Sequence, residues 1–180
     1  RASSELSPSD KASGIVNHLP ESMVKIDKAS KGIKCQKHMM AAADYISRHG
    51  KIDLEDENGN LLTHDELESR ISDWCKSQNT PYDEDGRKRS ADARRLIISC
   101  PKGSDPAAVR AAVKELAQEC LASEDFSYLF GIHYKSDEMP NEPDHPHVHL
   151  LIKALNSKGK RLNLRKQDLR YLRERFAVIA

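Results

Sequence analysis

The chain has 180 residues, of which 38% are hydrophobic, 5% aromatic and 32% charged, and its formal charge is +1. This composition fits one charge-rich globular domain and excludes collagen, coiled-coil arrays and long disordered chains. The four cysteines are far apart and form no Cys-x-x-Cys pair, and no apolar run approaches the ~20 residues of a bilayer span, so we expect a cytoplasmic protein without disulfides, span or secretory leader.

The first half of the chain alternates polar stretches with short periodic runs. Residues 1–20 are polar and lack apolar periodicity, which predicts a flexible tail before one domain over residues 21–180. A helix is expected over residues 35–48, where apolar residues recur at helical spacing before Gly50. The other elements predicted in this half are a strand, a turn, a capped helix and a polar loop: residues 23–26, Asn58-Gly59, a helix that begins after Thr63, and residues 79–90.

The second half of the chain predicts strands and helices in alternation. Residues 94–100 are typical of a strand, and Asp105 before Pro106 is typical of the start of a helix that runs to about Leu121. The remaining elements are two β-prone runs joined by an acidic link, and a last helix: residues 127–134, 146–154 and 165–178. Because two strands follow each other closely, this order predicts antiparallel pairing and an α+β fold with helices on one face of the sheet.

The most informative segment is DHPHVH at residues 144–149. Side chains two residues apart in a strand share a face, so His147 and His149 are expected to project together. His133 ends the preceding predicted strand and falls beside them if the two strands pair antiparallel. The three imidazoles predict a metal site for Zn, Mn, Fe, Ni or Cu, and a surface group of histidines without a ligand is the alternative.

Two acidic residues of the intervening link, Asp137 and Asp144, are the carboxylates that we expect beside these histidines. A carboxylate commonly holds the second ring nitrogen of a metal-bound imidazole, and solvation of the loop is the alternative role. Three histidines leave coordination positions open, which favours a Lewis-acid task such as polarising a phosphoryl oxygen. The nucleophile is then water, a histidine or a tyrosine hydroxyl, and Tyr45 lies off the apolar stripe of its predicted helix.

Three motifs, which occur in the order of one enzyme family, carry a resemblance to it. Residues 43–51 (ADYISRHGK) resemble the segment around the nucleophilic tyrosine of conjugative relaxases of the P mobilisation type, HUH endonucleases that include the T-DNA border endonuclease. Residues 96–103 (LIISCPKG) resemble their second motif, Ser-x-Pro-x-Gly after a strand, and DHPHVH resembles their third, His-hydrophobe-His motif. The chain differs from the family in having Lys153 where an asparagine is frequent and in a longer spacer before His147.

The resemblance covers residues 23–172 and implies a central antiparallel β-sheet with helices packed on its faces. It implies that Tyr45 attacks the scissile phosphate of an origin of transfer, leaving a 5′-phosphotyrosine and a free 3′-hydroxyl that can be rejoined without ATP. Mn²⁺ or Mg²⁺, with Zn²⁺ as an alternative, is the implied cofactor. The implied metal ligands and acidic partners are His133, His147 and His149 with Asp137 or Asp144.

A single-stranded DNA substrate is implied, held in a cationic groove. Residues 151–180 hold nine Lys and Arg against two acids, a pattern that phosphate neutralisation needs but that a solvated face also shows. The residues that we expect to contact DNA are Arg48, Ser99, Arg161, Arg165, Lys166, Arg170 and Arg173, with Arg94 and Arg95 as further candidates.

The implied partners are accessory relaxosome proteins and a type IV secretion coupling protein, for a monomer in the donor-cell cytoplasm that is translocated with its DNA. Two other functions remain open. One is a histidine-triad nucleotide hydrolase, whose alternating signature the HPHVHLL segment fits, and the other is a non-catalytic DNA-binding module with structural zinc. Because the chain does not begin with Met and ends within a predicted helix, we expect it to be a piece of a longer protein.

Overall fold

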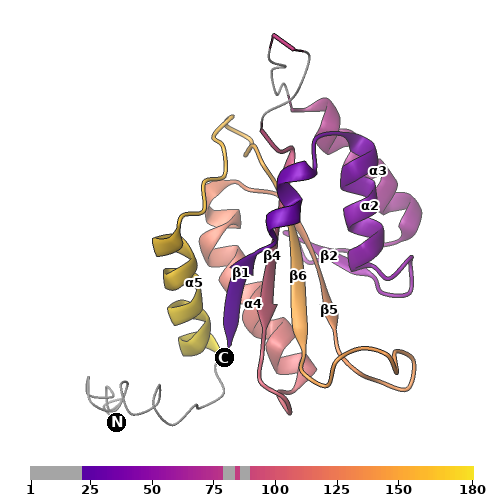
Figure 1. The fold of residues 1–180 in the computed structure, drawn as a ribbon, viewed down its shortest axis with the longest axis vertical. Coiled ribbons are helices and arrows are strands. Elements are labelled where there is room, and N and C mark those ends of the chain that lie inside the picture. The colour runs from indigo at the N-terminus through magenta and orange to yellow at the C-terminus, as the bar shows by residue number, and fades with distance from the viewer. Residues whose placement is uncertain (1–21, 79–83, 86–89) are drawn as a thin grey trace.

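The structure is a computed structural model that describes residues 22–78, 84–85 and 90–180 (Figure 1). The predicted tail over residues 1–20 and most of the predicted loop over residues 79–90 lie outside the described residues. The strands are β1 (Met23–Ile26), β2 (Leu54–Asp56), β3 (Leu61–Leu62), β4 (Ala93–Ser99), β5 (Tyr128–His133) and β6 (His147–Lys153). The helices are α2 (Gln36–Ile46), α3 (His64–Lys76), α4 (Pro106–Cys120) and α5 (Lys166–Ile179), with short 3-10 turns η1 (Lys28–Gly32) and η2 (Ala122–Glu124).

The described strands form one antiparallel sheet in the order β1-β4-β6-β5-β2-β3. This confirms the predicted α+β class and the predicted pairing of β5 with β6. No helix of the described residues is long and apolar enough to cross a bilayer.

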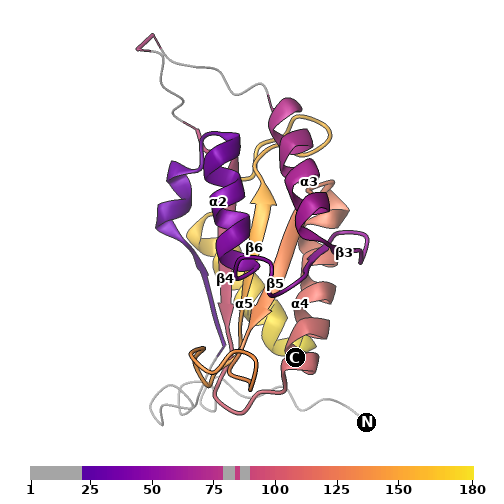
Figure 2. The same cartoon turned by 90° about the vertical axis from the view of Figure 1, so that its right-hand side faces the viewer.

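Helices cover both faces of the sheet, with α2 and α4 on opposite sides (Figure 2). Helices α4 and α5 pack on one core, which includes Phe130 and Leu150, and α2 and α3 pack on a second core, which includes Leu129 and Leu151. The strand order alone predicted helices on one face, and this was wrong. The reason is that every residue of β5 and the five middle residues of β6 are buried, so both faces of these strands are covered. This burial is typical of strands that lie between two layers.

The predicted helix starts are confirmed at two places. The side chain of Thr63 accepts a hydrogen bond from the main-chain N–H of Glu66, and that of Asp105 accepts one from the N–H of Ala107. Both contacts satisfy N–H groups that a helix end leaves without an intrahelical partner, which fixes where α3 and α4 begin.

The hairpin of β2 and β3 was not predicted, although its turn at Asn58-Gly59 was. Asp56 accepts hydrogen bonds from the N–H groups of Asn58 and Asn60, and Gly59 has the positive φ of 81° that this tight turn requires. The hairpin pairs with β5 and places Leu54 against Gly131 of that strand.

Helices α2 and α3 cover only part of their sheet face. Over β1 and β4 this face stays open: Met23 is 51% exposed, Lys25 is exposed, and Ile97 and Ser99 are partly exposed. In Figure 1 the lower halves of β1, β4 and β6 lie clear of these two helices. The open part of the sheet ends at the first residues of β6.

Candidate active site

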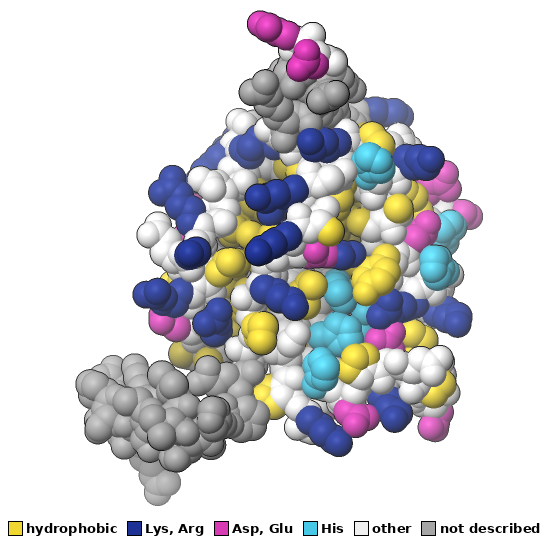
Figure 3. Space-filling model, in the orientation of Figure 1, with side chains coloured by type: hydrophobic (Ala, Val, Ile, Leu, Met, Phe, Trp, Pro, Cys, Tyr) yellow, Lys and Arg dark blue, Asp and Glu magenta, His cyan; other side chains and the backbone are white. Residues whose placement is uncertain are grey.

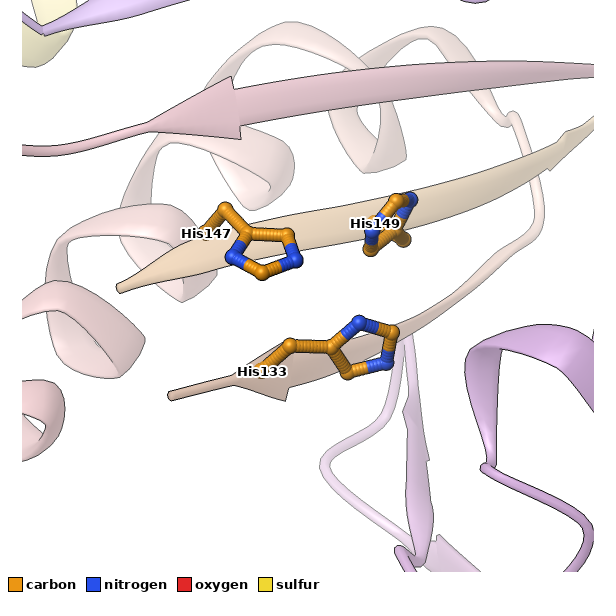
Figure 4. A group of neighbouring side chains, drawn as sticks. All are labelled: His133, His147 and His149. Atoms are coloured by element: carbon orange, nitrogen blue, oxygen red, sulfur yellow. The ribbon is translucent and has the colours of Figure 1, made fainter. Parts of the chain in front are cut away.

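Three histidines gather on the face of the sheet that α2 covers. His133 pairs directly across the strands with His147, and His149 lies between Ile97 of β4 and Gly131 of β5. One ring nitrogen from each histidine lies within 4.8 Å of the others (Figure 4). The structure therefore brings together the three histidines that the sequence predicted as metal ligands.

The histidine nitrogens are buried without enough partners. His133 is 1% exposed and His149 is 4% exposed, yet Nδ1 of His133 and both ring nitrogens of His149 have no hydrogen-bond partner among the described residues. Buried polar atoms are nearly always hydrogen-bonded, so unpartnered nitrogens that face one another fit a bound cation. Nε2 of His133 lies 2.6 Å from the carbonyl oxygen of Ile46. Because that oxygen only accepts, Nε2 carries the proton, and the lone pair of Nδ1 is available to a metal.

Burial keeps these imidazoles neutral. It lowers the pKa of His133 to about 4 and that of His149 to about 2, and it lowers the pKa of His147 as well. Only the neutral imidazole binds a metal ion, so the three rings are in the ligating form at neutral pH. The donor set suits a first-row divalent ion and leaves room for a substrate oxygen.

Tyr45 lies beside the histidine cluster. Its ring centroid is 5.7 Å from that of His149 and 6.4 Å from that of His133, and the side chain is 45% exposed. Tyr45 stands in the last turn of α2, whose apolar face is buried against the sheet through Met39, Ala43 and Ile46. The predicted nucleophile and the predicted metal ligands thus share one site.

Gly131 allows α2 to come this close to the sheet. A Cβ added at Gly131 would lie 2.8 Å from Cδ2 of Leu54 and 3.2 Å from Cγ2 of Ile46. A side chain at this position would require Leu54 of β2 and Ile46 at the end of α2 to shift. Sequence reasoning gave Gly131 no role, although a glycine inside a strand often marks a close approach of another segment.

Two guanidinium groups flank the Tyr45 ring. The Cζ atoms of Arg48 and Arg95 lie 4.8 and 4.9 Å from its centroid, within the range of cation–π attraction. Arg95 is paired with Asp27, burial lowers its pKa, and its Nε has no hydrogen-bond partner among the described residues. Two positive charges therefore lie against the ring of Tyr45, on the side of the molecule that carries the histidine cluster.

The carboxylate nearest to the cluster in the ion pairs of the described chain is Glu142, which sequence reasoning missed. Oε2 of Glu142 lies 4.0 Å from Nε2 of His147. Asp144 instead pairs with Lys102 at 3.1 Å and Lys135 at 3.7 Å, and its hydrogen bond and charge contacts with these lysines lower its pKa. Asp137 is exposed and belongs to none of the ion pairs that reach a histidine. No sequence pattern distinguishes Glu142 from its acidic neighbours, because the path of the loop over residues 134–146 decides which one turns inward.

The residues predicted to contact DNA fall on both sides of the sheet. Ser99 lies directly opposite His147, next to the cluster, and Arg48 lies at Tyr45. Helix α5 packs through Leu172 and Phe176 on the core of the other face, so its cations are not brought to the histidines. The predicted residues on or next to this helix are Arg161, Arg165, Lys166, Arg170 and Arg173.

A column of Lys and Arg side chains runs over β1, β4 and η1, beside the histidines (Figure 3). Lys25 of β1 and Lys28 and Lys31 of η1 are exposed, and Arg95 of β4 is partly exposed. In the view of Figure 3 this column lies beside and above the histidines. The sequence analysis predicts the cationic groove in the last 30 residues, where lysines and arginines are dense, and that prediction stands beside this second group of cations.

Comparison with known proteins decides the family. The model of the relaxase family described as MobA/VirD2-like, nuclease domain, matches residues 45–180. The chain belongs to this relaxase family. Two relatives are the T-DNA border endonucleases VirD2 of Rhizobium rhizogenes, 28% identical over 131 residues, and of Rhizobium radiobacter, 26% identical over 164 residues.

These matches cover 67% and 83% of this chain but only 28% and 37% of the two VirD2 proteins. The chain thus spans roughly a third of the length of these relatives. Its fold is similar to that of the conjugative relaxase TrwC, solved in complex with mutant oriT DNA: the TM-score is 0.51 at 13% identity, over 88% of this chain and 66% of that chain. The fold of the relaxase nuclease domain is therefore shared despite low identity.

Proposed function

We propose that this relaxase domain cuts one strand of DNA at an origin of transfer by attack of Tyr45. The observation that carries the proposal is the position of the Tyr45 ring, 5.7 Å from that of His149. His149 belongs to a cluster of three neutral histidines, of which His133 and His149 are buried and His147 is partly buried. Two findings support it: membership in the relaxase family, and similarity to the VirD2 proteins, which are T-DNA border endonucleases.

The chemical step is a transesterification at phosphorus. Oη of Tyr45 forms a bond to the scissile phosphorus while the bond from phosphorus to the 3′-oxygen breaks. The phenol proton passes to solvent at the exposed edge of the ring, and the leaving 3′-oxygen takes a proton from solvent. The product is a 5′-phosphotyrosine and a 3′-hydroxyl. Since the ester is kept on Tyr45, the same hydroxyl can attack it and rejoin the strand without ATP.

His133, His147 and His149 are proposed to hold a divalent cation, Mn²⁺ or Mg²⁺ with Zn²⁺ as the alternative. Such an ion, when bound, supplies Lewis-acid polarisation of a phosphate oxygen, which contributes several kcal/mol to transition-state stabilisation. The hydrogen bond to the Ile46 carbonyl fixes the His133 ring and its tautomer. Arg95 provides a partly buried positive charge beside the Tyr45 ring, with its Cζ atom 4.9 Å from the ring centroid.

Single-stranded DNA is proposed to lie across the open sheet face beside the cluster. Register places Met23 opposite Ser99 and Lys25 opposite Ile97, in the same rows as His147 and His149. Apolar side chains there offer surfaces for unstacked bases, and Lys25 offers a charge for the backbone. The DNA strand would reach the predicted contacts on α5 by passing round the edge of the sheet at β1, which α5 contacts.

The test is formation of a covalent adduct. Wild-type protein is incubated with Mn²⁺ and labelled single-stranded oligonucleotides that tile the transfer region of its replicon, and DNA-linked peptides are mapped. We expect an adduct on Tyr45 that Tyr45→Phe abolishes and that Tyr171→Phe, an exposed tyrosine of α5, keeps. An adduct elsewhere, or none from wild type, contradicts the proposal.

Chelation separates the alternatives. EDTA should abolish adduct formation by a relaxase, whereas hydrolysis of nucleotides by a histidine-triad enzyme needs no metal. Oligonucleotide binding without any adduct would favour the zinc-containing DNA-binding module. Accessory relaxosome proteins, a type IV secretion coupling protein, a monomeric state and a donor-cell cytoplasmic location belong to the same proposal.

A further inference from the structure

Arg48 and Glu142 form an ion pair that joins two segments 94 residues apart in the sequence. Nε of Arg48 donates to Oε1 of Glu142 at 2.5 Å, and its Nη2 donates to Oε2 at 3.0 Å. The Arg48 side chain is 23% exposed and that of Glu142 is 9% exposed, so the pair is partly shielded from water. A two-point contact of this kind fixes the orientation of the guanidinium plane as well as its position.

The same guanidinium contacts the proposed nucleophile. Its Cζ lies 4.8 Å from the Tyr45 ring centroid. Burial alone would lower the pKa of Arg48, but hydrogen bonds to Glu142 and to Tyr45 outweigh it, so this pKa is raised. Arg48 is therefore hydrogen-bonded to Glu142 while its guanidinium lies against the Tyr45 ring.

The backbone at this point needs a tertiary contact to hold it. Arg48 and His49 follow the end of α2 with φ values of 53° and 56°, and Gly50 follows with 84°. Left-handed backbone is unfavourable for residues other than glycine, and two in succession persist only where surrounding contacts support them. The ion pair with Glu142 is such a contact, because it fastens the Arg48 side chain to the loop over residues 134–146.

Glu142 also reaches the metal side of the site. Its Oε2, which accepts from Arg48, lies 4.0 Å from Nε2 of His147. One carboxylate thus stands between a proposed metal ligand and the cation that contacts Tyr45.

We propose that Glu142 is a positioning residue for the nucleophile: through Arg48 it holds the Tyr45 ring against the histidine cluster and sets the rate of strand transfer without setting DNA affinity. This inference rests on the proposed function. It differs from a general bracing role, in which loss of the pair would lower stability, DNA affinity and rate together.

The experiment compares Glu142→Gln with Glu138→Gln, an exposed glutamate of the same loop. The adduct rate is measured in single turnover with Mn²⁺ and saturating amounts of the tiled oligonucleotide that wild type cleaves, and the Kd of that oligonucleotide is measured without metal. Glu142→Gln should slow the rate at least about 10-fold, as expected for a misplaced reacting group, and leave Kd unchanged. Glu138→Gln should change neither quantity.

A second readout needs neither metal nor DNA. With 3-fluorotyrosine placed at position 45, the ¹⁹F resonance of the metal-free protein should shift or broaden in Glu142→Gln and stay as in wild type in Glu138→Gln. Glu142→Asp keeps the charge but is one methylene shorter, so it should restore part of the rate. This variant also tests the proposal if Glu142→Gln fails to fold.

A wild-type rate in Glu142→Gln with an unchanged ¹⁹F resonance would overturn the inference. So would a parallel fall of rate, DNA affinity and melting temperature. If wild type itself forms no adduct, the proposed function fails instead, while the ¹⁹F comparison still reports whether Glu142 holds Tyr45.

Discussion

The ring of His133 is hydrogen-bonded to the main chain of Ile46, with Nε2 2.6 Å from the carbonyl oxygen. Ile46 is the residue after Tyr45, so the histidine cluster and the end of the nucleophile helix are joined directly. The bond also determines which nitrogen of His133 is free, because a carbonyl oxygen only accepts. The tautomer of His133 and the placement of Tyr45 are therefore coupled in the fold, as the proposed metal site requires.

Metal affinity should depend on His147 but not on its neighbour His145. We expect His147→Ala to weaken Mn²⁺ binding at least about 10-fold, since it removes one of three nitrogen ligands. His145 is exposed and precedes the strand, so His145→Ala is the matched control. Isothermal titration calorimetry measures both. Equal affinities for the two variants would count against the three-histidine site.

Substitution of Gly131 should separate α2 from the sheet. The Cβ of Gly131→Ala would meet Leu54 at 2.8 Å and Ile46 at 3.2 Å, and overpacking of this kind costs about 1–3 kcal/mol of unfolding free energy. The adduct rate should also fall, because Tyr45 moves with Ile46. Urea denaturation measures the stability. Gly32→Ala is the control, since a Cβ there meets nothing within 4 Å, and equal losses in both variants would refute the steric explanation.

Acid should destabilise the metal-free protein. The folded pKa values of about 4 for His133 and about 2 for His149 lie below the ordinary 6.5, so between these values the unfolded chain binds protons that the folded chain excludes. The contribution of these two histidines to the free energy of unfolding is therefore fully present above about pH 6.5. It is lost as the pH falls, by at most about 1.4 kcal/mol per pH unit for each histidine.

Chemical denaturation of the metal-free protein at several pH values between 7.5 and 5 measures this slope. The variant His149→Gln removes one of the two titrating rings and should give a shallower slope than wild type. Identical slopes for the two proteins would show that His149 is not held neutral by burial.

DNA affinity should depend more on the open sheet face than on α5. Lys25→Ala removes a charge in the same strand row as His149, whereas Arg173→Ala removes one from a helix on the other core. For single strands, each lost phosphate contact lowers the salt dependence of log K by about 0.7. Fluorescence anisotropy over a range of salt concentrations measures this slope. A larger change for Arg173→Ala would instead support the groove predicted on the last helix.

The main elements were predictable because their signals are local. The strand β6 was predicted from alternation, and the pairing that brings His133 to His147 followed from two strands in close succession. The position of Tyr45 beside them was not derivable from periodicity. It came from the resemblance to relaxases, because the contact between α2 and the sheet depends on residues that are distant in sequence.

The features that sequence reasoning missed depend on tertiary packing. The hairpin of β2 and β3 has strands too short for a period-2 pattern to be visible. Glu142 comes from a loop whose path no local rule specifies, and Gly131 matters only because Leu54 and Ile46 meet above it. The second covered face was missed because the packing of α2 and α3 on Leu129 and Leu151 joins residues that are distant in the sequence.

Strand β6 serves two layers at once: His147 and His149 face the site while Val148 and Leu150 fill the core on the other side. A shift of the strand register by one residue would turn the imidazoles toward the apolar core and the aliphatic side chains toward the site. One strand register therefore decides two things together: whether the imidazoles meet at the site, and whether the apolar layer beneath α4 is complete.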